Sequence, residues 1–281
     1  YLHSIEGYMG YFNQNLNALD FKLYQPSKLL QQYIHSYWAV QKKEFKEPIT
    51  CKILSDASMG FVVNLSCAYS MQVNNNSFSC SHNFTLDGPT KHPSYIKFEK
   101  ELDLIGVRFK PGGAYVFFDE NIDTFLDKNF KFKSTKSWLL DALYKKLILQ
   151  NSIKEKIQVL ESFLLQKLRQ KKKQNATWIF PFIQKVYEQK GDVTLDSLCS
   201  EIDISLRQLE RRFKQEVGLS PKLFIRIIRM QNAKEKLSSL NIKSLTTTAY
   251  EAGFFDQAHF TKEFKLFMKE TPKNYYQTKL S

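Results

Sequence analysis

Hydrophobic and polar positions alternate in short runs over roughly the first 130 residues. Residues 51–66 combine β-branched and aromatic residues with breaks at Asp56 and at Met59-Gly60. Short apolar runs bounded by turn residues are typical of β-strands. The pattern predicts an antiparallel β sandwich or barrel within residues 1–133, preceded by a short helical or extended lead.

The same pattern continues toward the end of this region. Residues 94–118 contain two or three further strand-like runs, interrupted by a turn signal at Pro111-Gly-Gly113. Asn74-Asn-Asn-Ser77 predicts another turn. The expected fold class of the whole chain is α+β, because the periodicity becomes helical after residue 133.

Apolar residues recur at helical spacing between residues 134 and 168. The first series includes Trp138, Leu143 and Leu147, and the second runs from Ile157 to Leu168. Asn151-Ser152 lies between them and is a reasonable N-cap. We predict two amphipathic helices over 134–168, followed by a polar, basic linker over 169–176.

The remainder of the chain, 177–281, is expected to be entirely helical. Helix-starting residues such as Ser205 and Ser220-Pro221, and a helix-ending residue at Gly218, punctuate it consistently. The helices are predicted near 177–190, 194–202, 206–216, 220–238, 244–252, 256–268 and 272–278.

One pattern occurs twice in this helical region. Residues 194–224 and 244–275 each give a short helix, a tight turn, a second helix and a turn that ends in Pro. Phe213 in the first copy corresponds to Phe264 in the second, 51 residues later. This is the pattern of a duplicated helix-turn-helix, and it predicts a domain that binds DNA.

The second helix of each copy enters the major groove in such motifs, with its N-terminal residues at the bases. Arg pairs with guanine edges, Gln pairs with adenine, and Glu accepts a hydrogen bond from the cytosine amino group. Asp256 is better interpreted as an N-cap than as a base reader. The outward-facing candidates for base contact are Arg207, Glu210, Arg211, Gln257, His259 and Lys262.

A long helix is expected between the two copies. At 1.5 Å per residue, a helix over about 222–238 is roughly 25 Å long. A rigid spacer of this size can hold two recognition helices about one DNA turn, or roughly 34 Å, apart. The candidates for phosphate contact are Arg226, Arg229 and Lys265, together with Lys234 on the long helix.

Charge strengthens the prediction of DNA binding. The 281 residues include 41 Lys and Arg against 28 Asp and Glu, for a net charge of +13. The excess begins near residue 128: residues 1–127 sum to −2, 128–175 to +10 and 176–281 to +5. A basic surface attracts nucleic acid or an anionic membrane. The alternative is a solvated, Lys-rich face without a partner.

Other compositional features narrow the class of protein. No run of about 18 apolar residues predicts a transmembrane helix, and the first residues do not resemble a signal peptide. The four cysteines form no Cys-x-x-Cys pair, so reduced thiols in a cytoplasmic, nucleoid-associated protein are expected. We expect no cofactor, no membrane partner and no metal site, since Cys80 and His82 alone cannot form a tetrahedral site.

Residues 177–281 resemble the DNA-binding domain of AraC/XylS-type bacterial transcription regulators. The resemblance rests on Ala249-x-x-x-Gly253-Phe254-x-Asp256-Gln257, on Phe260-x-Lys262-x-Phe264-Lys265 and on Thr271-Pro272-x-x-Tyr275. The sequence departs from the family at Ala258, often Ser, at Lys262, often Arg, and at Glu270, often Gly. Because Lys lacks the bidentate fork of Arg, Lys262 is also a candidate for phosphate contact.

The N-terminal region is similar, more faintly, to sensor domains fused to such regulators, through 53–66 and 105–118. This resemblance implies a β domain that binds a small-molecule effector or forms a dimer. Helices at 137–168 would then form the homodimer. The resemblance to this family of regulators also implies that the chain binds promoter DNA and RNA polymerase. It implies that the chain activates transcription in preference to repressing it.

The sequence identifies no effector and no effector-binding residue. Asp56, Arg108 and Lys110 are polar residues near predicted turns. We interpret them as surface strand and turn residues in preference to ligand-binding residues.

Two other functions are alternatives to sequence-specific regulation. A cupin-like enzyme fused to a DNA-binding domain would need clustered His and carboxylate ligands, and the five histidines form no such cluster, so no catalytic residue is assigned. An architectural protein would bind all DNA sequences alike, with a steep salt dependence. Glu210 argues against this second alternative, because a pure phosphate binder has no use for a carboxylate there.

Overall fold

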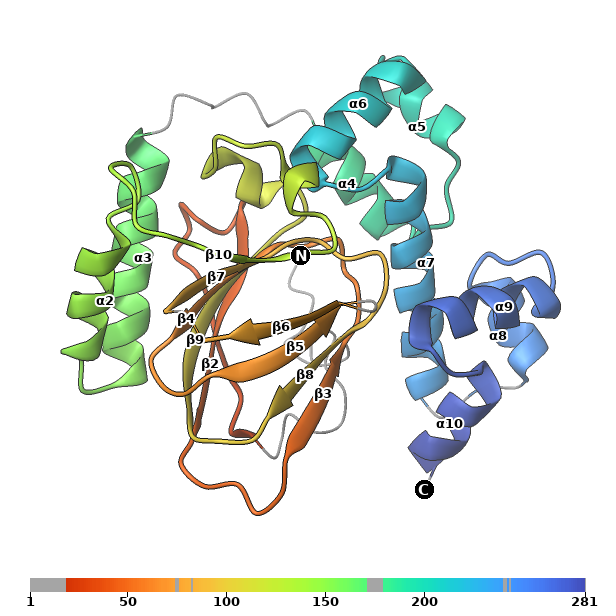
Figure 1. Ribbon diagram of the computed structural model, residues 1–281. Coiled ribbons are helices and arrows are strands. Elements are labelled where there is room, and N and C mark those ends of the chain that lie inside the picture. Colours follow the sequence, from red (N-terminus) through yellow and green to blue (C-terminus); the bar gives the residue numbers. More distant parts are fainter. Residues whose placement is uncertain are drawn as a thin grey trace.

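The computed structural model describes residues 19–73, 76–81, 83–170, 179–239, 242 and 244–280. A β-rich part with two helices is followed by an all-α part (Figure 1). The predicted α+β class and the order of its two parts are confirmed. Within the described ranges, none of the helices has the length and apolar character needed to cross a membrane.

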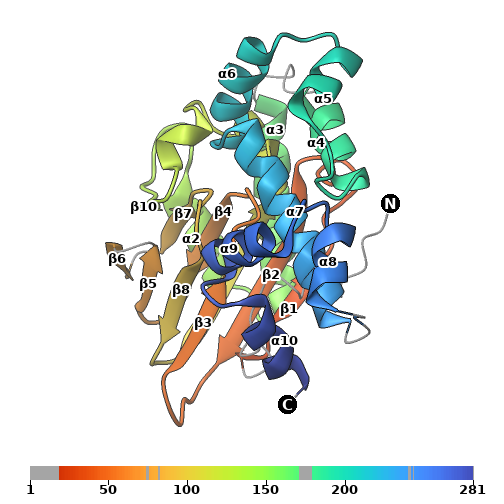
Figure 2. The ribbon, with the colours of Figure 1, turned by 90° about the vertical axis from the view of Figure 1, so that its right-hand side faces the viewer.

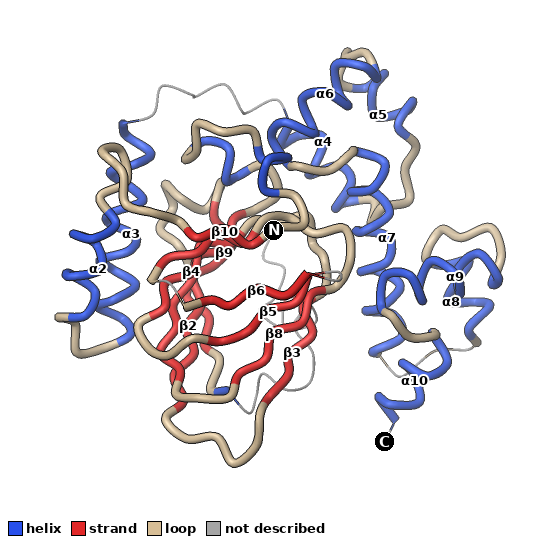
Figure 3. Tube along the Cα trace, viewed as in Figure 1, coloured by secondary structure: helices blue, strands red, loops and turns tan. Residues whose placement is uncertain are grey.

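The strands form two antiparallel sheets that face each other (Figure 3). The six-stranded sheet has the order β1 (Lys22–Tyr24), β2 (Ile34–Lys42), β9 (Leu102–Phe109), β4 (Gly60–Asn64), β7 (Phe84–Asp87) and β10 (Asn129–Lys131). The four-stranded sheet has the order β3 (Ile49–Ile53), β8 (Ser94–Phe98), β5 (Tyr69–Val73) and β6 (Asn76–Cys80). The predicted sandwich is therefore confirmed.

Both faces of the six-stranded sheet are covered, and alternate residues of each strand point to opposite faces. In β9, Ile105 and Val107 belong to the core shared with the helices that follow the sheet. Leu104 and Arg108 of the same strand face the second sheet and border a pocket there. Gly106 permits the ring of Trp38 to lie directly over the strand, since a Cβ at this position would come within 2.2 Å of the indole.

Two helices, α2 (Leu140–Ile148) and α3 (Ile153–Gln170), pack on the outer face of this sheet (Figure 1). Helix α3 begins as predicted, because Ser152 and Glu155 exchange hydrogen bonds at its N-terminus. The first helix starts later than predicted: Trp138 precedes it and is buried in the β-domain core. Helix α3 extends two residues into the predicted linker, of which 171–176 lie outside the described residues.

Two short segments differ from the sequence interpretation. Residues after the 111–113 turn form a 3-10 helix, η2 (Gly113–Val116), and not a third strand, and η3 (Ile122–Phe125) follows it. Asn76 and Ser77 belong to β6 and not to a turn, while 74–75 lie outside the described residues.

Seven helices make up the described C-terminal part: α4 (Ile179–Glu188), α5 (Leu195–Glu201), α6 (Leu206–Val217), α7 (Pro221–Ser238), α8 (Leu245–Glu251), α9 (Gln257–Met268) and α10 (Pro272–Leu280). Each lies within a few residues of its predicted range. Figure 2 shows α5 and α6 beyond one end of α7, with α8, α9 and α10 around the other end. A single apolar cluster joins them.

The two parts of the chain are in contact through the β3–β4 loop. Leu54 and Ala57 of this loop belong to the apolar cluster of the C-terminal helices. The side-chain amide of Gln231 on α7 donates a hydrogen bond to the carbonyl of Ser55 at 3.2 Å. The C-terminal helices are therefore docked on the β domain.

Candidate nucleic-acid interface

The first helix-turn-helix consists of α5 and α6. The hydroxyl of Thr194 accepts a hydrogen bond from the N-terminus of α5. At α6, Ser205 and Gln208 form a reciprocal capping box. Gly218 ends this helix with a φ of 83°, in the left-handed conformation that glycine adopts without strain.

The second helix-turn-helix consists of α8 and α9 and repeats these devices. Ser244 caps α8, and the carboxylate of Asp256 accepts a hydrogen bond from the backbone N–H of His259 at 2.7 Å. The predicted N-cap role of Asp256 is thereby confirmed. Lys269 ends α9 with a φ of 59°, in the position equivalent to Gly218.

The two copies match in length as well as in capping. Helices α5 and α8 have 7 residues each, and α6 and α9 have 12 each. The turn between the helices is one residue longer in the second copy, where it runs over 252–256, than in the first, where it runs over 202–205. The helix-turn-helix duplication predicted from the sequence is present in the fold.

The inner faces of the two recognition helices are buried as predicted. Leu209 and Phe213 of α6 are completely buried, and so are Phe260 and Phe264 of α9. Because this inner face is fixed by packing, the opposite face of each helix is fixed as well.

The outer faces carry the six predicted base-contact residues, and all six are exposed. Arg207, Glu210 and Arg211 lie together in the first half of α6. Gln257, His259 and Lys262 lie together in the first half of α9. The arrangement provides two separate clusters of donors and acceptors, one at the N-terminal part of each recognition helix.

Two of these side chains are oriented by neighbours. The hydroxyl of Thr246 on α8 donates a hydrogen bond to the side-chain oxygen of Gln257. This leaves the amide NH₂ of Gln257 and a second lone pair on its oxygen for another partner. The ring of His259 packs edge-on against Phe254, with 5.6 Å between the centroids.

The three residues predicted to contact phosphate differ in their exposure and in their partners. Lys265 is exposed on α9, whereas Arg226 of α7 forms an ion pair with Glu263 of α9 at 2.6 Å. Arg229 donates a hydrogen bond to the carbonyl of Gly191 at 2.9 Å. Both arginines therefore fasten α7 to its neighbours and are only half-buried, so part of each guanidinium still reaches solvent.

The expected phosphate contact of Lys234 is wrong, because this residue is buried. Burial lowers the pKa of Lys234 to about 8, an effect to which the charges of Lys279 and Lys52 add and which Glu235 opposes. The helical pattern alone did not show that this side of α7 is covered.

Two exposed aromatic residues were missed by the sequence interpretation. Phe255, in the turn before α9, is 89% exposed, and Tyr250 on α8 is 60% exposed. Phe254, next to Phe255 in the same turn, is 5% exposed, so no sequence signal distinguished the exposed phenylalanine from the buried one. Apolar side chains at this place in a motif can contact thymine methyl groups.

The C-terminal ends of both recognition helices contact the β domain at equivalent positions. Gly218, at the end of α6, lies so close to Pro89 and Ile122 that a Cβ there would come within 2.7 Å of Pro89. At the end of α9, the ammonium of Lys52 donates a hydrogen bond to the carbonyl of Met268. The N-terminal halves of both recognition helices remain exposed.

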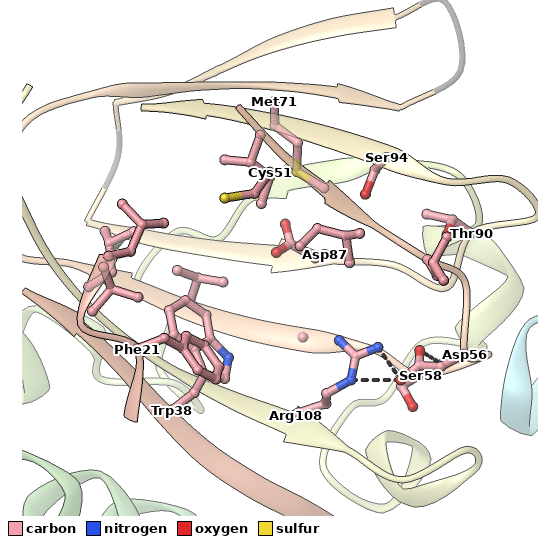
Figure 4. Close-up of a pocket in the computed structure, with 18 of the residues that line it drawn as sticks. Phe21, Trp38, Cys51, Asp56, Ser58, Met71, Asp87, Thr90, Ser94 and Arg108 are labelled. Atoms are coloured by element: carbon pink, nitrogen blue, oxygen red, sulfur yellow. Dashed lines mark hydrogen bonds and ion pairs between the residues drawn. The ribbon is translucent and has the colours of Figure 1, made fainter. Parts of the chain in front are cut away.

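A pocket of about 100 Å³ lies between the two sheets (Figure 4). Phe21 and Trp38 border one end of it, and Asp56, Ser58 and Thr90 border the other. The interpretation of Asp56 as a surface residue is wrong: its side chain is buried and forms an ion pair with Arg108, whose Nε donates at 2.7 Å. Lys110, the third residue of that set, does not border the pocket.

Asp87 projects into the middle of this pocket from β7 (Figure 4). The side-chain amide of Asn129 donates a hydrogen bond to its carboxylate. Burial raises the pKa of Asp87 to about 6, and the Asn129 hydrogen bond and the charge of Arg108 limit the rise. Within the described part of the chain, no group of three or more His, Cys, Asp or Glu side chains is arranged to hold a metal ion.

Comparison with known proteins gives two domain matches. Residues 198–278 match a model described as a helix-turn-helix domain. Residues 22–131 match a model described as a domain of unknown function, DUF6597. The first match covers both motifs except the first three residues of α5, and the second covers the β sandwich.

The relatives are transcription activators. The HTH-type transcriptional activator RhaS of Pectobacterium carotovorum is 28% identical over 102 residues, which are 36% of this chain and 36% of that protein. RhaS of Escherichia coli is 31% identical over 86 residues, 31% of each chain. This chain therefore matches about a third of the length of these curated relatives.

Among solved structures, ToxT from Vibrio cholerae aligns with 86% of this chain and 97% of its own, with a TM-score of 0.46 and 12% identity. The domain match and the RhaS relatives confirm the resemblance that the sequence motifs predicted for the C-terminal region.

Proposed function

We propose that this chain, whose C-terminal region is a helix-turn-helix domain of the AraC type, regulates transcription by reading DNA sequence with α6 and α9. The observation that carries the proposal is the duplicated motif. Two recognition helices of equal length each present an exposed polar cluster in their first half, while their inner faces are fully packed.

Helix α7 supports simultaneous reading of two grooves. It has 18 residues, so its length is about 27 Å. Successive major grooves on one face of a duplex are roughly 34 Å apart. Arg226 holds α7 to α9 and Phe224 packs on Phe213 of α6, so this helix fixes the separation of the two recognition helices.

The chemistry of the two clusters supports sequence reading over general DNA binding. Arg207 and Arg211 match guanine edges, and Gln257 matches adenine. Glu210 would repel phosphates and can accept a hydrogen bond from a cytosine amino group. A surface that binds only the backbone has no use for this carboxylate.

Activation, RNA polymerase contact and dimerisation are parts of the same proposal. The relatives are named activators, which favours activation here. Leu139, Ile148 and Leu149 are more than half exposed at the two ends of α2. These apolar side chains are candidates for a contact between two copies, because the inner faces of α2 and α3 are already used by the β domain.

The test is selection of genomic fragments bound by the full chain, compared with an Arg207→Ala/Gln257→Ala double variant. We expect the unaltered protein to enrich two half-sites about 10 base pairs apart. The double variant should lose this enrichment and retain weak general binding.

Lys154→Ala is the matched control, since Lys154 is an exposed residue on α3, far from the motifs in the fold. It changes the net charge by the same amount as Arg207→Ala. If the control loses the enrichment as fully as the double variant, the clusters on α6 and α9 do not read sequence.

A further inference from the structure

The pocket between the sheets has an excess of negative charge. Asp56 and Asp87 contribute two carboxylates, and Arg108 contributes one guanidinium. Arg108 is bonded to Asp56 through Nε and through a terminal nitrogen. The hydrogen-bond partner of Asp87 is the neutral amide of Asn129. A cation beside Asp87 would therefore balance a charge that the pocket leaves uncompensated.

An anionic ligand is disfavoured by the same geometry. A ligand carboxylate on the remaining N–H groups of Arg108 would be a third acidic group beside a single guanidinium that already pairs with Asp56. The apolar end, formed by Phe21 and Trp38, would accept the hydrocarbon part of a ligand.

We propose that this pocket binds a small organic ammonium ion, with the cation at Asp87 and the apolar body against Trp38, and that two loops report its occupancy to the C-terminal helices. The binding half of this inference is independent of DNA. The reporting half rests on the proposed DNA-reading function for its biological meaning.

The first of these loops, between β3 and β4, faces the pocket and the C-terminal helices at once. Asp56 and Ser58 line the pocket. Ala57, between them, is buried in the apolar cluster of the C-terminal helices, and Leu54 belongs to that cluster while also bordering the pocket. The carbonyl of Ser55 accepts the hydrogen bond from Gln231 of α7. A shift of Asp56 therefore moves residues that pack on α7.

The second loop, between β7 and β8, has the same double role. Gly88 and Thr90 border the pocket, and Pro89 between them packs at the end of α6 beside Gly218. The hydroxyl of Ser55 donates a hydrogen bond to the carbonyl of Thr90, which ties the two loops together. A cation at Asp87 would lie next to Gly88, where the second loop begins. Gly60 of β4 lies between Asp87 and Arg108, the partner of Asp56 in the first loop, so the same cation is one strand away from the first loop.

Binding is tested on the full chain with three probes that share one ring: benzylamine, benzyl alcohol and benzoate. Isothermal titration should show benzylamine binding at least about tenfold more tightly than the alcohol, as expected for a hydrogen bond to a charged group. Benzoate should bind most weakly. Equal binding of amine and alcohol, preference for benzoate, or no binding of any probe would overturn the proposal.

Two variants locate the site. Asp87→Asn keeps an acceptor for Asn129 and removes the charge, so it should reduce benzylamine binding to the level of the alcohol. Glu99→Gln is the control, because Glu99 is an exposed carboxylate paired with Lys97 outside the pocket. If Asp87→Asn does not fold, Gly60→Leu provides a second test, since a side chain there would enter the pocket beside Asp87. Unchanged benzylamine binding in the folded variant contradicts the assignment.

The reporting route is tested by hydrogen exchange without DNA. Benzylamine should change amide protection in 53–58 and in α7 of the unaltered protein. In a Lys52→Met/Gln231→Leu variant it should bind with unchanged affinity and no longer affect α7. Binding with no response in α7, or a response in α7 that survives in this variant, would show that the contact between Ser55 and Gln231 does not carry the signal. Either result leaves the DNA-reading proposal untouched, because no DNA is present.

Discussion

The two helix-turn-helix motifs have nearly the same scaffold and different outer surfaces. Helix lengths, N-caps and the trailing prolines at 221 and 272 agree between them. When the two recognition helices are aligned, Arg207 of α6 corresponds to Ala258 of α9, and Leu206 corresponds to Gln257. The scaffold is therefore maintained by packing and capping, whereas the exposed positions differ between the two motifs.

The motifs also differ in how they are held by the β domain. The end of α6 makes an apolar contact through Gly218, whereas the end of α9 accepts a hydrogen bond from Lys52. The first contact depends on shape and the second on a single long side chain. We expect the first motif to be the more firmly docked of the two.

The largest expected effect comes from the core of each motif. Phe213→Ala and Phe264→Ala should each reduce the free energy of unfolding by about 3–5 kcal/mol. Phe213 contacts Phe182 of α4 and Phe224 of α7, whereas Phe264 contacts Phe260 and Tyr275.

Hydrogen exchange shows which helices lose stability in each of these two variants. Phe213→Ala should lower protection mainly in α4 and α6, and Phe264→Ala mainly in α9 and α10. Leu206→Ala, on the exposed side of α6, is the control and should change little. If both core variants lower protection equally throughout the C-terminal region, the motifs do not behave as separate units.

Base contacts should give the next largest effect. Arg207→Ala and Gln257→Ala should each weaken binding to the selected site by about 1–3 kcal/mol. The first should relax specificity at a guanine in one half-site, and the second at an adenine in the other. Binding assays on single-base variants of the site measure this directly. Loss of specificity in the same half-site for both variants would refute the assignment of one groove to each motif.

The equivalent left-handed positions at the helix ends should respond in opposite directions. Gly218→Ala should destabilise the protein by roughly 2 kcal/mol, since it combines an unfavourable φ with a contact to Pro89. Lys269→Gly should stabilise it by up to about 1 kcal/mol by relieving the same strain. Thermal unfolding of both variants checks this, and changes of the same sign would contradict the structural equivalence.

The smallest expected effect is on DNA binding by variants of Arg211 and Lys262, which occupy equivalent positions in α6 and α9. If Lys262 contacts a phosphate, Lys262→Ala should reduce the salt slope of DNA binding by about 1 and weaken binding to all sequences alike. Arg211→Ala should alter sequence preference as well. A titration of binding against salt for both variants separates the two roles, and an unchanged slope for Lys262→Ala would exclude a phosphate contact.

The helical part of this fold could be predicted almost completely from the sequence. Ser205, Gly218 and Asp256 act locally, through hydrogen bonds or backbone conformation within a few residues, so their effects are readable from the chain alone. Because the motif occurs twice, the helix boundaries predicted for one copy could be compared with those predicted for the other.

The features that the sequence did not reveal depend on contacts between distant residues. Asp56 and Arg108 are 52 positions apart and meet only because β9 pairs with β4 at the edge of the pocket. Lys234 lies on an amphipathic helix and is buried, with Lys52 of β3 and Lys279 of α10 near enough to affect its charge. Trp138 is spaced from Leu143 and Leu147 as in a helix, but it precedes α2. Its side chain packs in the aromatic core of the β domain.

The central claim is that one chain reads two successive major grooves with a fixed separation. The most direct measurement is the affinity of the full chain for its selected site after about 5 base pairs, half a helical turn, are inserted between the half-sites. Because α7 fixes the spacing, binding should fall to that of a single half-site. Unchanged affinity after the insertion would show that α6 and α9 do not bind the duplex together.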